Sequence, residues 1–251
     1  MSLPQDFDWK YYVLRYPDLW NNNIRSPESA KAHYLNYGMK EGRKVSGDYK
    51  ELKESIKQIR DYIYTSDFLN KTNFLRFAKD YKDKPASFLE VGVYEGKCTC
   101  FCLQNFLTHP QSTITVIDTF EGSMENEKAF CSALLFDIFK HNIELTNSAN
   151  KVLIKRGYSK DVLRTLIGNK YDFIYIDASH TTWDVLQDAV LSFLLLKVGG
   201  VLLFDDYLWN VFNDPLLCPK KGIDAFLDCF SKFYQILDKG GQVAIRKTGE
   251  T

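Results

Sequence analysis

The sequence predicts an α/β domain built around a mostly parallel β-sheet with an antiparallel C-terminal hairpin, preceded by a small α-helical module. Short apolar, β-branched runs that stop at an acid or a glycine recur in the last two thirds of the chain. Buried parallel strands have this pattern where they open onto a ligand crevice. Helical stretches alternate with these runs, as in βαβ units. The first 48 or so residues instead crowd aromatic side chains around short helical patterns.

Composition limits the function. The chain of 251 residues can hold one full α/β domain and a small appendage. Its formal net charge of zero argues against a nucleic-acid partner. The N-terminus has neither a basic region nor an apolar core, so we expect no signal peptide. The longest apolar stretch, residues 190–196, is too short to span a bilayer. We therefore expect a cytoplasmic protein without a membrane span.

The cysteines favour free thiols in a reducing compartment. Three of them alternate inside a predicted helix and so point to different faces, and the other three lack the pair spacing of zinc sites. We expect buried, inert thiols at all six positions: Cys98, Cys100, Cys102, Cys131, Cys218 and Cys229.

The N-terminal elements are predicted to be helical. Ser26-Pro27 is a helix start, with serine as cap and proline at the first helical position, and Gly38 is a plausible stop. Two short helices are expected in this aromatic module. Apolar residues at helical spacing predict one amphipathic helix over residues 49–64, and a second is expected over residues 68–81. The predicted domains are a helical module (1–48), linking helices (49–84) and the α/β domain (85–251).

Seven strands and five helices are predicted in the α/β domain. The strands are residues 87–91, 113–117, 151–155, 171–176, 201–204, 234–237 and 242–246. The helices are residues 97–107, 127–145, 160–166, 184–196 and 222–233. Lys239-Gly240-Gly241 joins the last two strands as a hairpin.

The first strand runs into a glycine-containing turn, Glu90-x-Gly92-x-x-x-Gly96. Glycines at a strand-to-helix turn let a ligand approach the backbone, and the following helix presents free N–H groups. The spacing disfavours a dinucleotide-binding fold. Glu90 suits an amine-bearing ligand, and Asp118, which closes the next strand, suits a ribose diol. The alternative, that the glycines only pack the helix, stays open.

Acidic residues also end the fourth and fifth strands. Asp177 ends the fourth, and Asp205 and Asp206 end the fifth. Neighbouring carboxylates repel unless a cation neutralises them, and oxygen ligands suit Mg²⁺. His180, with an ordinary pKa of about 6.5, could accept a hydroxyl proton beside them. Alternatively, Asp205 or Asp206 caps a turn, and His180 has a structural role.

Together these residues resemble the class I S-adenosylmethionine-dependent methyltransferases over roughly residues 85–247. Segments 117–122, 176–180 and 195–207 are similar to those of the sugar- and macrolide-modifying (macrocin-type) O-methyltransferase group. The resemblance implies a Rossmann-like, seven-stranded methyltransferase sheet. Tyr94-Glu95 in the glycine turn departs from the family's small residues. The implied S-adenosylmethionine-binding residues are Glu90, Gly92, Gly96, Asp118, Thr119, Gly157, Ser159 and Asp177.

The implied activity is methyl transfer to a hydroxyl of a sugar or a glycosylated small molecule. Asp177, Asp205 and Asp206 would hold Mg²⁺ to orient the acceptor, and His180 with Asp177 would be catalytic. N-methylation, metal-independent methyl transfer and a non-catalytic scaffold remain alternatives. The aromatic segment 207–221 could be a lid, with Trp183 and Met124 contributing, or its Trp209 and Phe212 could form a homo-oligomer contact.

Overall fold

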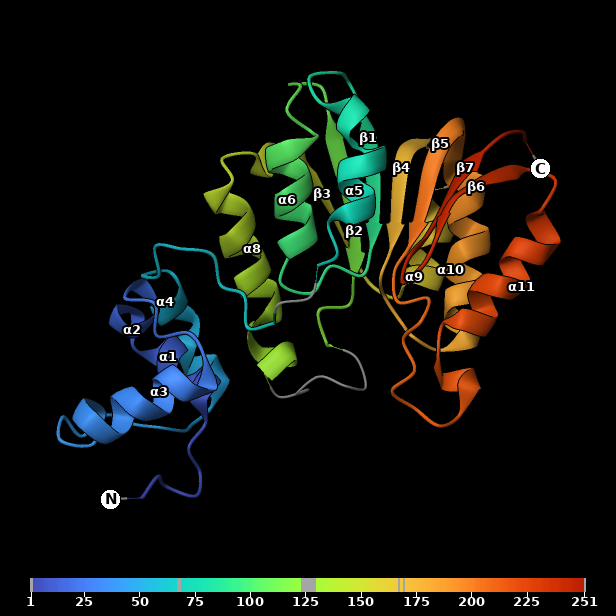
Figure 1. Cartoon of the computed structure of the whole chain (residues 1–251). Helices are drawn as coiled ribbons and strands as arrows, with labels where there is room; N and C mark the ends of the chain where they lie inside the picture. The colour runs from blue at the N-terminus through green and yellow to red at the C-terminus, as the bar shows by residue number, and fades with distance from the viewer. Residues whose placement is uncertain (1, 67–68, 123–129, 167, 169, 251) are drawn as a thin grey trace. The chain divides into compact units, whose positions relative to one another are not determined.

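The computed structural model describes residues 2–66, 69–122, 130–166, 168 and 170–250 (Figure 1). The chain divides into two compact units, which are described separately. The first contains Met1–Phe68, Tyr94–Gly96 and Phe120–Asn147, and the second contains Leu69–Val93, Lys97–Thr119 and Ser148–Thr251. Within the described ranges, no helix has the length and apolar character needed to cross a membrane.

The second unit is built on a seven-stranded sheet, as the sequence predicts. Its strands are β1 (Ser87–Val91), β2 (Thr113–Asp118), β3 (Val152–Arg156), β4 (Tyr171–Ile176), β5 (Leu196–Phe204), β6 (Tyr234–Lys239) and β7 (Val243–Lys247). The order across the sheet is β3-β2-β1-β4-β5-β7-β6. The first five strands are parallel, and β7 pairs antiparallel with both β5 and β6. The strand order reverses between β1 and β4, so a ligand crevice is expected at their carboxyl ends.

Helices cover both faces of this sheet (Figure 1). One face carries α5 (Thr72–Phe77) and α6 (Lys97–Asn105), and the other carries α9 (Ser159–Thr165), α10 (Thr182–Leu195) and α11 (Lys220–Phe230). Side chains of β4 alternate between the two layers. Tyr175 packs against Phe74 of α5, with ring centroids 4.8 Å apart. Ile174 and Ile176 instead join the buried cluster that includes Val185 and Ile223. Asp177, two residues after Tyr175, therefore continues the face of the sheet that α5 covers.

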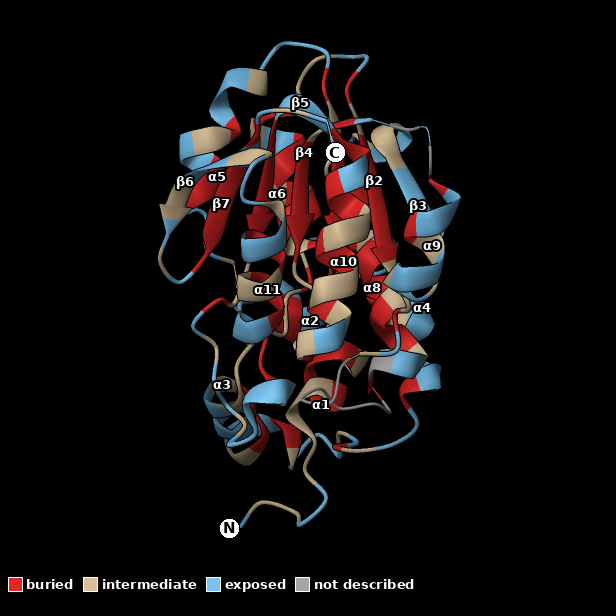
Figure 2. Ribbon diagram, turned by 90° about the vertical axis from the view of Figure 1, so that its right-hand side faces the viewer, coloured by how far each residue is buried: buried red, intermediate tan, exposed pale blue. Residues whose placement is uncertain are grey.

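The central strands are buried and the edge strands are more exposed (Figure 2). All but the first residue of β1 are buried, whereas four of the five residues of β3 are exposed. Leu153 and Ile154 of β3 are 50% and 39% exposed. The core of the sheet thus lies around β1, β4 and β5, where the predicted site residues are carried.

The first unit contains five helices among its described residues: α1 (Trp9–Arg15), α2 (Pro17–Asn21), α3 (Pro27–His33), α4 (Lys53–Ile56) and α8 (Phe136–Leu145). The predicted start of α3 is confirmed, because Ser26 and Ser29 form a reciprocal capping box. A π-helical turn, Tyr34–Gly38, follows it. A Cβ atom on Gly38 would lie 2.1 Å from the Tyr12 hydroxyl, so the glycine permits close packing there.

Two helix predictions need correction. The single helix expected over residues 49–64 is a 3₁₀ turn, Tyr49–Leu52, followed by α4, which ends at Ile56. Beyond it the backbone bonds to distant side chains. Arg60 N–H donates to Asn21 Oδ1 at 2.9 Å, and Trp20 Nε1 donates to the Tyr62 carbonyl at 3.1 Å. The helix expected over residues 68–81 is confined to α5 and a 3₁₀ turn at Lys79–Tyr81, and residue 68 lies outside the described residues.

Two smaller differences concern the region before α8 and the cysteines. Within the described part of the region expected as one helix over residues 127–145, a π-helical turn, Cys131–Leu135, leads into α8, and residues 127–129 lie outside the described part. Cys98, Cys100, Cys102 and Cys218 are buried free thiols, as predicted. Cys229 is exposed, so the prediction of burial is wrong there. The side chain of Cys131 lies outside what the structure describes.

Candidate active site

The glycine turn after β1 is held between two neighbouring strands. Gly92 N–H donates to the Ile117 carbonyl at 2.9 Å, and Asp177 N–H donates to the Val91 carbonyl at 2.8 Å. Gly92 has a φ of +86°, and a Cβ atom there would lie 1.9 Å from the Asp177 carbonyl oxygen. Only glycine fits both conditions. The turn is therefore in direct backbone contact with the residue that ends β4.

Glu90 lies fully buried at the end of β1. Its Oε2 accepts a hydrogen bond from the Thr99 hydroxyl at 2.6 Å. Its Oε1 is buried and has no hydrogen-bond partner among the described residues. Burial raises the pKa of Glu90 to about 8, and the hydrogen bond from Thr99 partly offsets this. A buried acceptor without a donor is costly, so a ligand or a water that donates to Glu90 would stabilise it.

Asp118 connects the glycine turn to the end of β2. Its Oδ2 accepts a hydrogen bond from Val93 N–H at 2.7 Å, and its backbone carbonyl accepts one from Gly157 N–H at 2.9 Å. The Thr119 carbonyl accepts a bond from Arg156 Nε at 3.1 Å. Ser159 begins α9 directly after this turn. The carboxyl ends of β1, β2 and β3 thus bring Glu90, Gly92, Asp118, Thr119, Gly157 and Ser159 to one edge of the sheet.

Gly96 and the unusual residue Glu95 belong to the first unit. Gly96 has a φ of +79°, and a Cβ atom there would meet the Phe139 ring at 2.7 Å. Glu95 is buried and accepts hydrogen bonds from the backbone N–H and the hydroxyl of Thr65, at 2.9 Å and 2.6 Å. Burial raises the pKa of Glu95 to about 7. Sequence reasoning noticed Glu95 only as a departure from small residues and missed its role in holding Thr65.

Asp177, His180 and Asp206 form a compact group at the ends of β4 and β5. One ligand atom from each lies within 4.8 Å of the others. His180 Nε2 is 3.1 Å from Asp206 Oδ2. Burial, followed by the nearby carboxylates of Asp205 and Asp206, raises the pKa of Asp177 to about 8. Asp206 has a φ of +57°, which lies in the left-handed region. A cation would relieve the mutual repulsion of these acids.

Asp205 was expected in this group but is engaged elsewhere. Its Oδ2 accepts a hydrogen bond from the Tyr175 hydroxyl. Its Oδ1 accepts bonds from Asp206 N–H at 2.9 Å and from Gln242 Nε2 at 3.3 Å. Among the described residues, the candidate metal-binding group therefore contains His180 with Asp177 and Asp206, and not Asp205. Tyr175 was missed, although its spacing of two from Asp177 places both on one face of the strand and could have revealed it.

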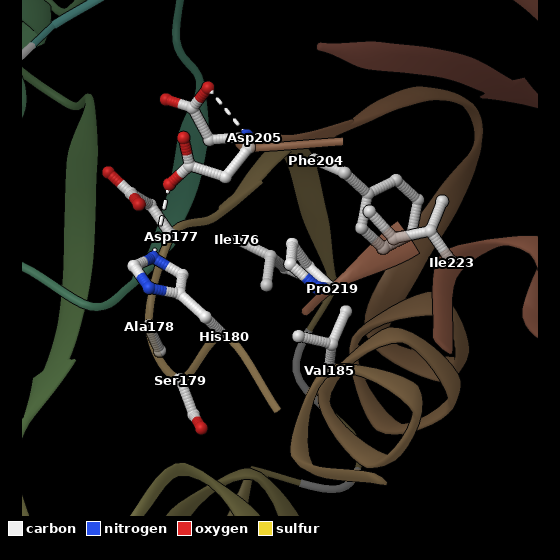
Figure 3. A pocket seen from close by; sticks show the side chains of 11 residues that line it. Ile176, Asp177, Ala178, Ser179, His180, Val185, Phe204, Asp205, Pro219 and Ile223 are labelled. Carbon is white, nitrogen blue, oxygen red and sulfur yellow. Dashed lines mark hydrogen bonds and ion pairs between the residues drawn. The ribbon is translucent and has the colours of Figure 1, made fainter. Parts of the chain in front are cut away.

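These residues line one side of a small pocket (Figure 3). Asp177, His180 and Asp205 lie on its polar side, and apolar side chains of Ile176, Val185, Phe204, Pro219 and Ile223 lie opposite. The segment after β5 borders this pocket. The rings of His180 and Trp209 are 4.3 Å apart, and the Thr182 hydroxyl donates to the Cys218 carbonyl at 3.0 Å.

Several apolar side chains of this region are exposed. Leu208 and Val211 are 60% and 68% exposed, and Trp183 at the start of α10 is 50% exposed. The role of the segment as a lid stays a prediction, and Met124 lies outside the described residues. Whether a substrate or a second copy of the chain covers these side chains stays a prediction.

Part of the chain matches known methyltransferases in sequence. Residues 89–207 match a family model described as a methyltransferase domain. Tricin synthase 2 of Oryza sativa subsp. japonica is 28% identical over 128 residues, which are 49% of this chain and 38% of that protein. A caffeoyl-CoA O-methyltransferase of Citrus natsudaidai is 30% identical over 80 residues, 30% of this chain and 34% of that protein. The match thus spans about a third of the length of these curated relatives.

Solved structures share the fold at low sequence identity. An O-methyltransferase from Bacillus cereus, solved in complex with SAH, has a TM-score of 0.53 and 18% identity, covering 80% of this chain and 92% of that chain. A putative O-methyltransferase from Klebsiella pneumoniae has a TM-score of 0.55 and 13% identity, covering 85% and 96%. The family match covers residues 89–207, a little under half of the chain, and the solved structures share the fold of its sheet.

Proposed function

We propose that this protein transfers a methyl group from S-adenosylmethionine to a hydroxyl group of a sugar or a glycosylated small molecule, with a divalent cation orienting the acceptor. The single observation that carries the proposal is the juxtaposition at the Gly92–Asp177 contact. It joins a glycine turn suited to the methyl donor and an acidic group suited to a cation.

The residues at the ends of β1 to β3 fit the methyl donor. The unpartnered Oε1 of Glu90 could accept from the amino group of the methionine end, directly or through water. Asp118 and Thr119 would receive the ribose, and Gly157 and Ser159 the adenine, as the family resemblance implies. When bound, the donor supplies a methyl group on a positively charged sulfur, ready for in-line transfer. The protein's part is to orient it.

Asp177, His180 and Asp206 fit a divalent cation. Two carboxylates offer the oxygen ligands that Mg²⁺ prefers, and an imidazole in the same group widens the choice to Mn²⁺. The raised pKa of Asp177 has the repulsion of neighbouring acids as one of its causes, which a cation would remove. When bound, the cation would lower the pKa of the acceptor hydroxyl and fix its direction.

His180 has two candidate roles in this reaction. The short distances within the group favour a role as the third ligand of the cation. Its contact with Asp206 also suits a general base, because an imidazole that donates from Nε2 carries its basic lone pair on Nδ1. The two roles differ in what His180→Ala would do. Loss of a ligand weakens cation binding, whereas loss of a base lowers kcat and flattens its pH profile with cation binding unchanged.

The acceptor is inferred from the macrocin-type resemblance and from the aromatic lid segment. Trp209, in contact with His180, could lie against a sugar face at the mouth of the pocket. The cytoplasmic location and the homo-oligomeric state stay predictions of the sequence. N-methylation, metal-independent methyl transfer and a non-catalytic scaffold are the outcomes that the test must distinguish.

The test is a methylation assay on purified protein. The protein is incubated with S-adenosylmethionine, with Mg²⁺ or with a chelator, and with nucleotide sugars, glycans and simple amines. Mass spectrometry then looks for one added methylene. We expect Mg²⁺-dependent transfer to a hydroxylated acceptor, reduced at least about 100-fold in Asp177→Asn and Asp206→Asn. Transfer to amines alone, or full activity with chelator, would contradict the proposal. Absence of S-adenosylmethionine binding in calorimetry would favour the scaffold.

A further inference from the structure

The hydroxyl group of Tyr175 lies between two carboxylates of the candidate site. It is 3.0 Å from Asp177 Oδ2, and it also bonds Asp205 Oδ2. A phenol has one hydrogen, so it donates to one carboxylate at a time and cannot satisfy both fully. The two acids are thereby connected through one side chain that is itself no candidate ligand.

The position of Tyr175 is fixed by its surroundings. Its side chain is 2% exposed, and its ring packs edge-on against Phe74 at 4.8 Å. Because Tyr175 and Asp177 are two residues apart on β4, their side chains leave the same face of the sheet. The hydroxyl therefore meets Asp177 at the carboxyl end of the strand, where the candidate cation-binding group lies.

Asp205 is in turn held in place from its other side. Asp206 N–H and Gln242 Nε2 donate to Asp205 Oδ1, at 2.9 Å and 3.3 Å. With Tyr175 on Oδ2, each oxygen of Asp205 has a donor from the protein. Such a carboxylate is better suited to fix the direction of the phenol than to bind a cation.

We propose that Tyr175 is a positioning residue of the cation site and that Asp205 acts through Tyr175 rather than as a ligand. Tyr175 donates its single hydroxyl hydrogen to Asp177 Oδ2 when Asp177 binds the cation through Oδ1, and Asp205 fixes the direction of the phenol by competing for that hydrogen. Residues that orient metal ligands in this way typically contribute about 10-fold to 100-fold in metal affinity. This inference depends on the proposed function, because it assumes that Asp177 binds a divalent cation.

The test measures Mn²⁺ affinity by calorimetry on the full chain without acceptor. Tyr175→Phe removes only the hydroxyl group and is expected to weaken Mn²⁺ binding about 10-fold to 100-fold. Tyr171→Phe is the matched control. Tyr171 is buried on the same strand and its hydroxyl donates to Thr115 Oγ1 at 3.2 Å, away from the acids. We expect the control to bind Mn²⁺ as the wild type does, and both variants to keep their affinity for S-adenosylmethionine.

A double-mutant cycle separates the two roles of Asp205. If Asp205 acts through Tyr175, Asp205→Asn weakens Mn²⁺ binding less than Asp206→Asn does, and the effects of Asp205→Asn and Tyr175→Phe are not additive. If Asp205 is a ligand, its substitution is as damaging as Asp206→Asn and adds to Tyr175→Phe. The second result would overturn the inference.

The outcomes also separate this inference from the proposed function. Mn²⁺ binding by the wild type with unchanged affinity in Tyr175→Phe overturns the inference alone. No Mn²⁺ binding by the wild type overturns the cation part of the proposed function and this inference with it. Thermal melting checks the fold of each variant. If Tyr175→Phe does not fold, Gln242→Met tests the connection from Asp205 to Asp177 while the Tyr175 hydroxyl stays in place. An unchanged Mn²⁺ affinity in Gln242→Met would contradict the inference.

Discussion

Asp188 is a buried acid that the proposed reaction does not use. It lies on α10 and is 1% exposed, and neither carboxyl oxygen has a hydrogen-bond partner among the described residues. Burial raises its pKa from 3.8 to about 7, and the nearby Ser159 hydroxyl partly offsets this rise. The folded protein therefore keeps Asp188 neutral over a pH range in which the unfolded chain ionises it.

This difference makes stability depend on pH. The folded-state pKa lies above the unfolded value, so stability is fully present below pH 3.8 and falls as pH rises from there to about 7. Asp188→Asn removes the ionisable group and should raise the free energy of unfolding at pH 8 by up to about 4 kcal/mol, with little gain at pH 4. Urea denaturation at the two pH values measures this.

Asp184, one turn earlier on α10, supplies the control for that experiment. Its carboxylate accepts hydrogen bonds from the hydroxyls of Ser179 and Thr181, at 2.9 Å and 2.8 Å. Asp184→Asn should therefore bring no gain at pH 8. An equal change in stability for Asp188→Asn at both pH values would show that Asp188 is not neutral in the folded protein.

At the scale of elements, one asparagine fixes the path of the chain after α4. Asn142 of α8 accepts from Ile63 N–H at 2.7 Å and donates to the carbonyls of Ile63 and Glu95, both at 2.8 Å. All three partners lie in the same compact unit. The side chain thus holds residues 63 and 95 together where a helix was expected to continue.

Asn142→Leu should destabilise the protein markedly. The substitution keeps the size of the side chain but leaves two carbonyls and one N–H without their partner, at about 1–3 kcal/mol for each buried group. We expect a loss of at least about 3 kcal/mol in urea denaturation. Asn105→Ala is the control, because the Asn105 amide donates to the Phe101 carbonyl within its own helix and its loss should cost far less. Similar losses in both variants would contradict this role of Asn142.

Local patterns predicted the strands well and the linking helices poorly. Each strand from β1 to β7 was expected within a few residues, except that β5 begins before the predicted Val201. The strands could be predicted because their apolar alternation and their glycines lie in the local sequence. The helix expected over residues 49–64 failed because its competitors, Asn21, Trp20 and Asn142, are distant in sequence. Its apolar pattern was still informative, since Ile59 and Ile63 are buried.

In the candidate site, too, the features set by local sequence were predicted and those set by distant residues were not. Glu90, Gly92 and Asp177 were expected from their positions at strand ends, which topology alone brings together. The engagement of Asp205 could not be expected, because it depends on the direction of the Tyr175 hydroxyl and on Gln242 of the C-terminal hairpin region. Sequence spacing predicts which residues meet at an edge, but the hydrogen-bond partner of each oxygen requires coordinates.

At the scale of the whole molecule, the sequence boundary after residue 48 can be tested by truncation. Within the first unit, the rings of Tyr11 and Tyr49 are 6.1 Å apart, and Lys10 lies 4.9 Å from the ring centroid of Phe130. A chain of residues 49–251 would lose these contacts and expose part of the buried surface around Leu52.

We expect that shortened chain to melt at a lower temperature than the full chain in scanning calorimetry. A chain of residues 5–251 is the control, since Ser2 is exposed and the removed residues carry none of these contacts. An unchanged melting temperature for residues 49–251 would instead support an independent helical module over residues 1–48, which is what the predicted domain boundary implies.

The close approach of Gly92 to the Asp177 carbonyl limits how the sequence of this chain can change. Because the glycine turn and the strand end that carries Asp177 meet through backbone atoms, neither can be redesigned without the other. We expect sequence change to be tolerated more readily in the segment after β5, where Leu208 and Val211 are exposed. A variable surface segment and a fixed β1–β4 junction would then coexist in one chain.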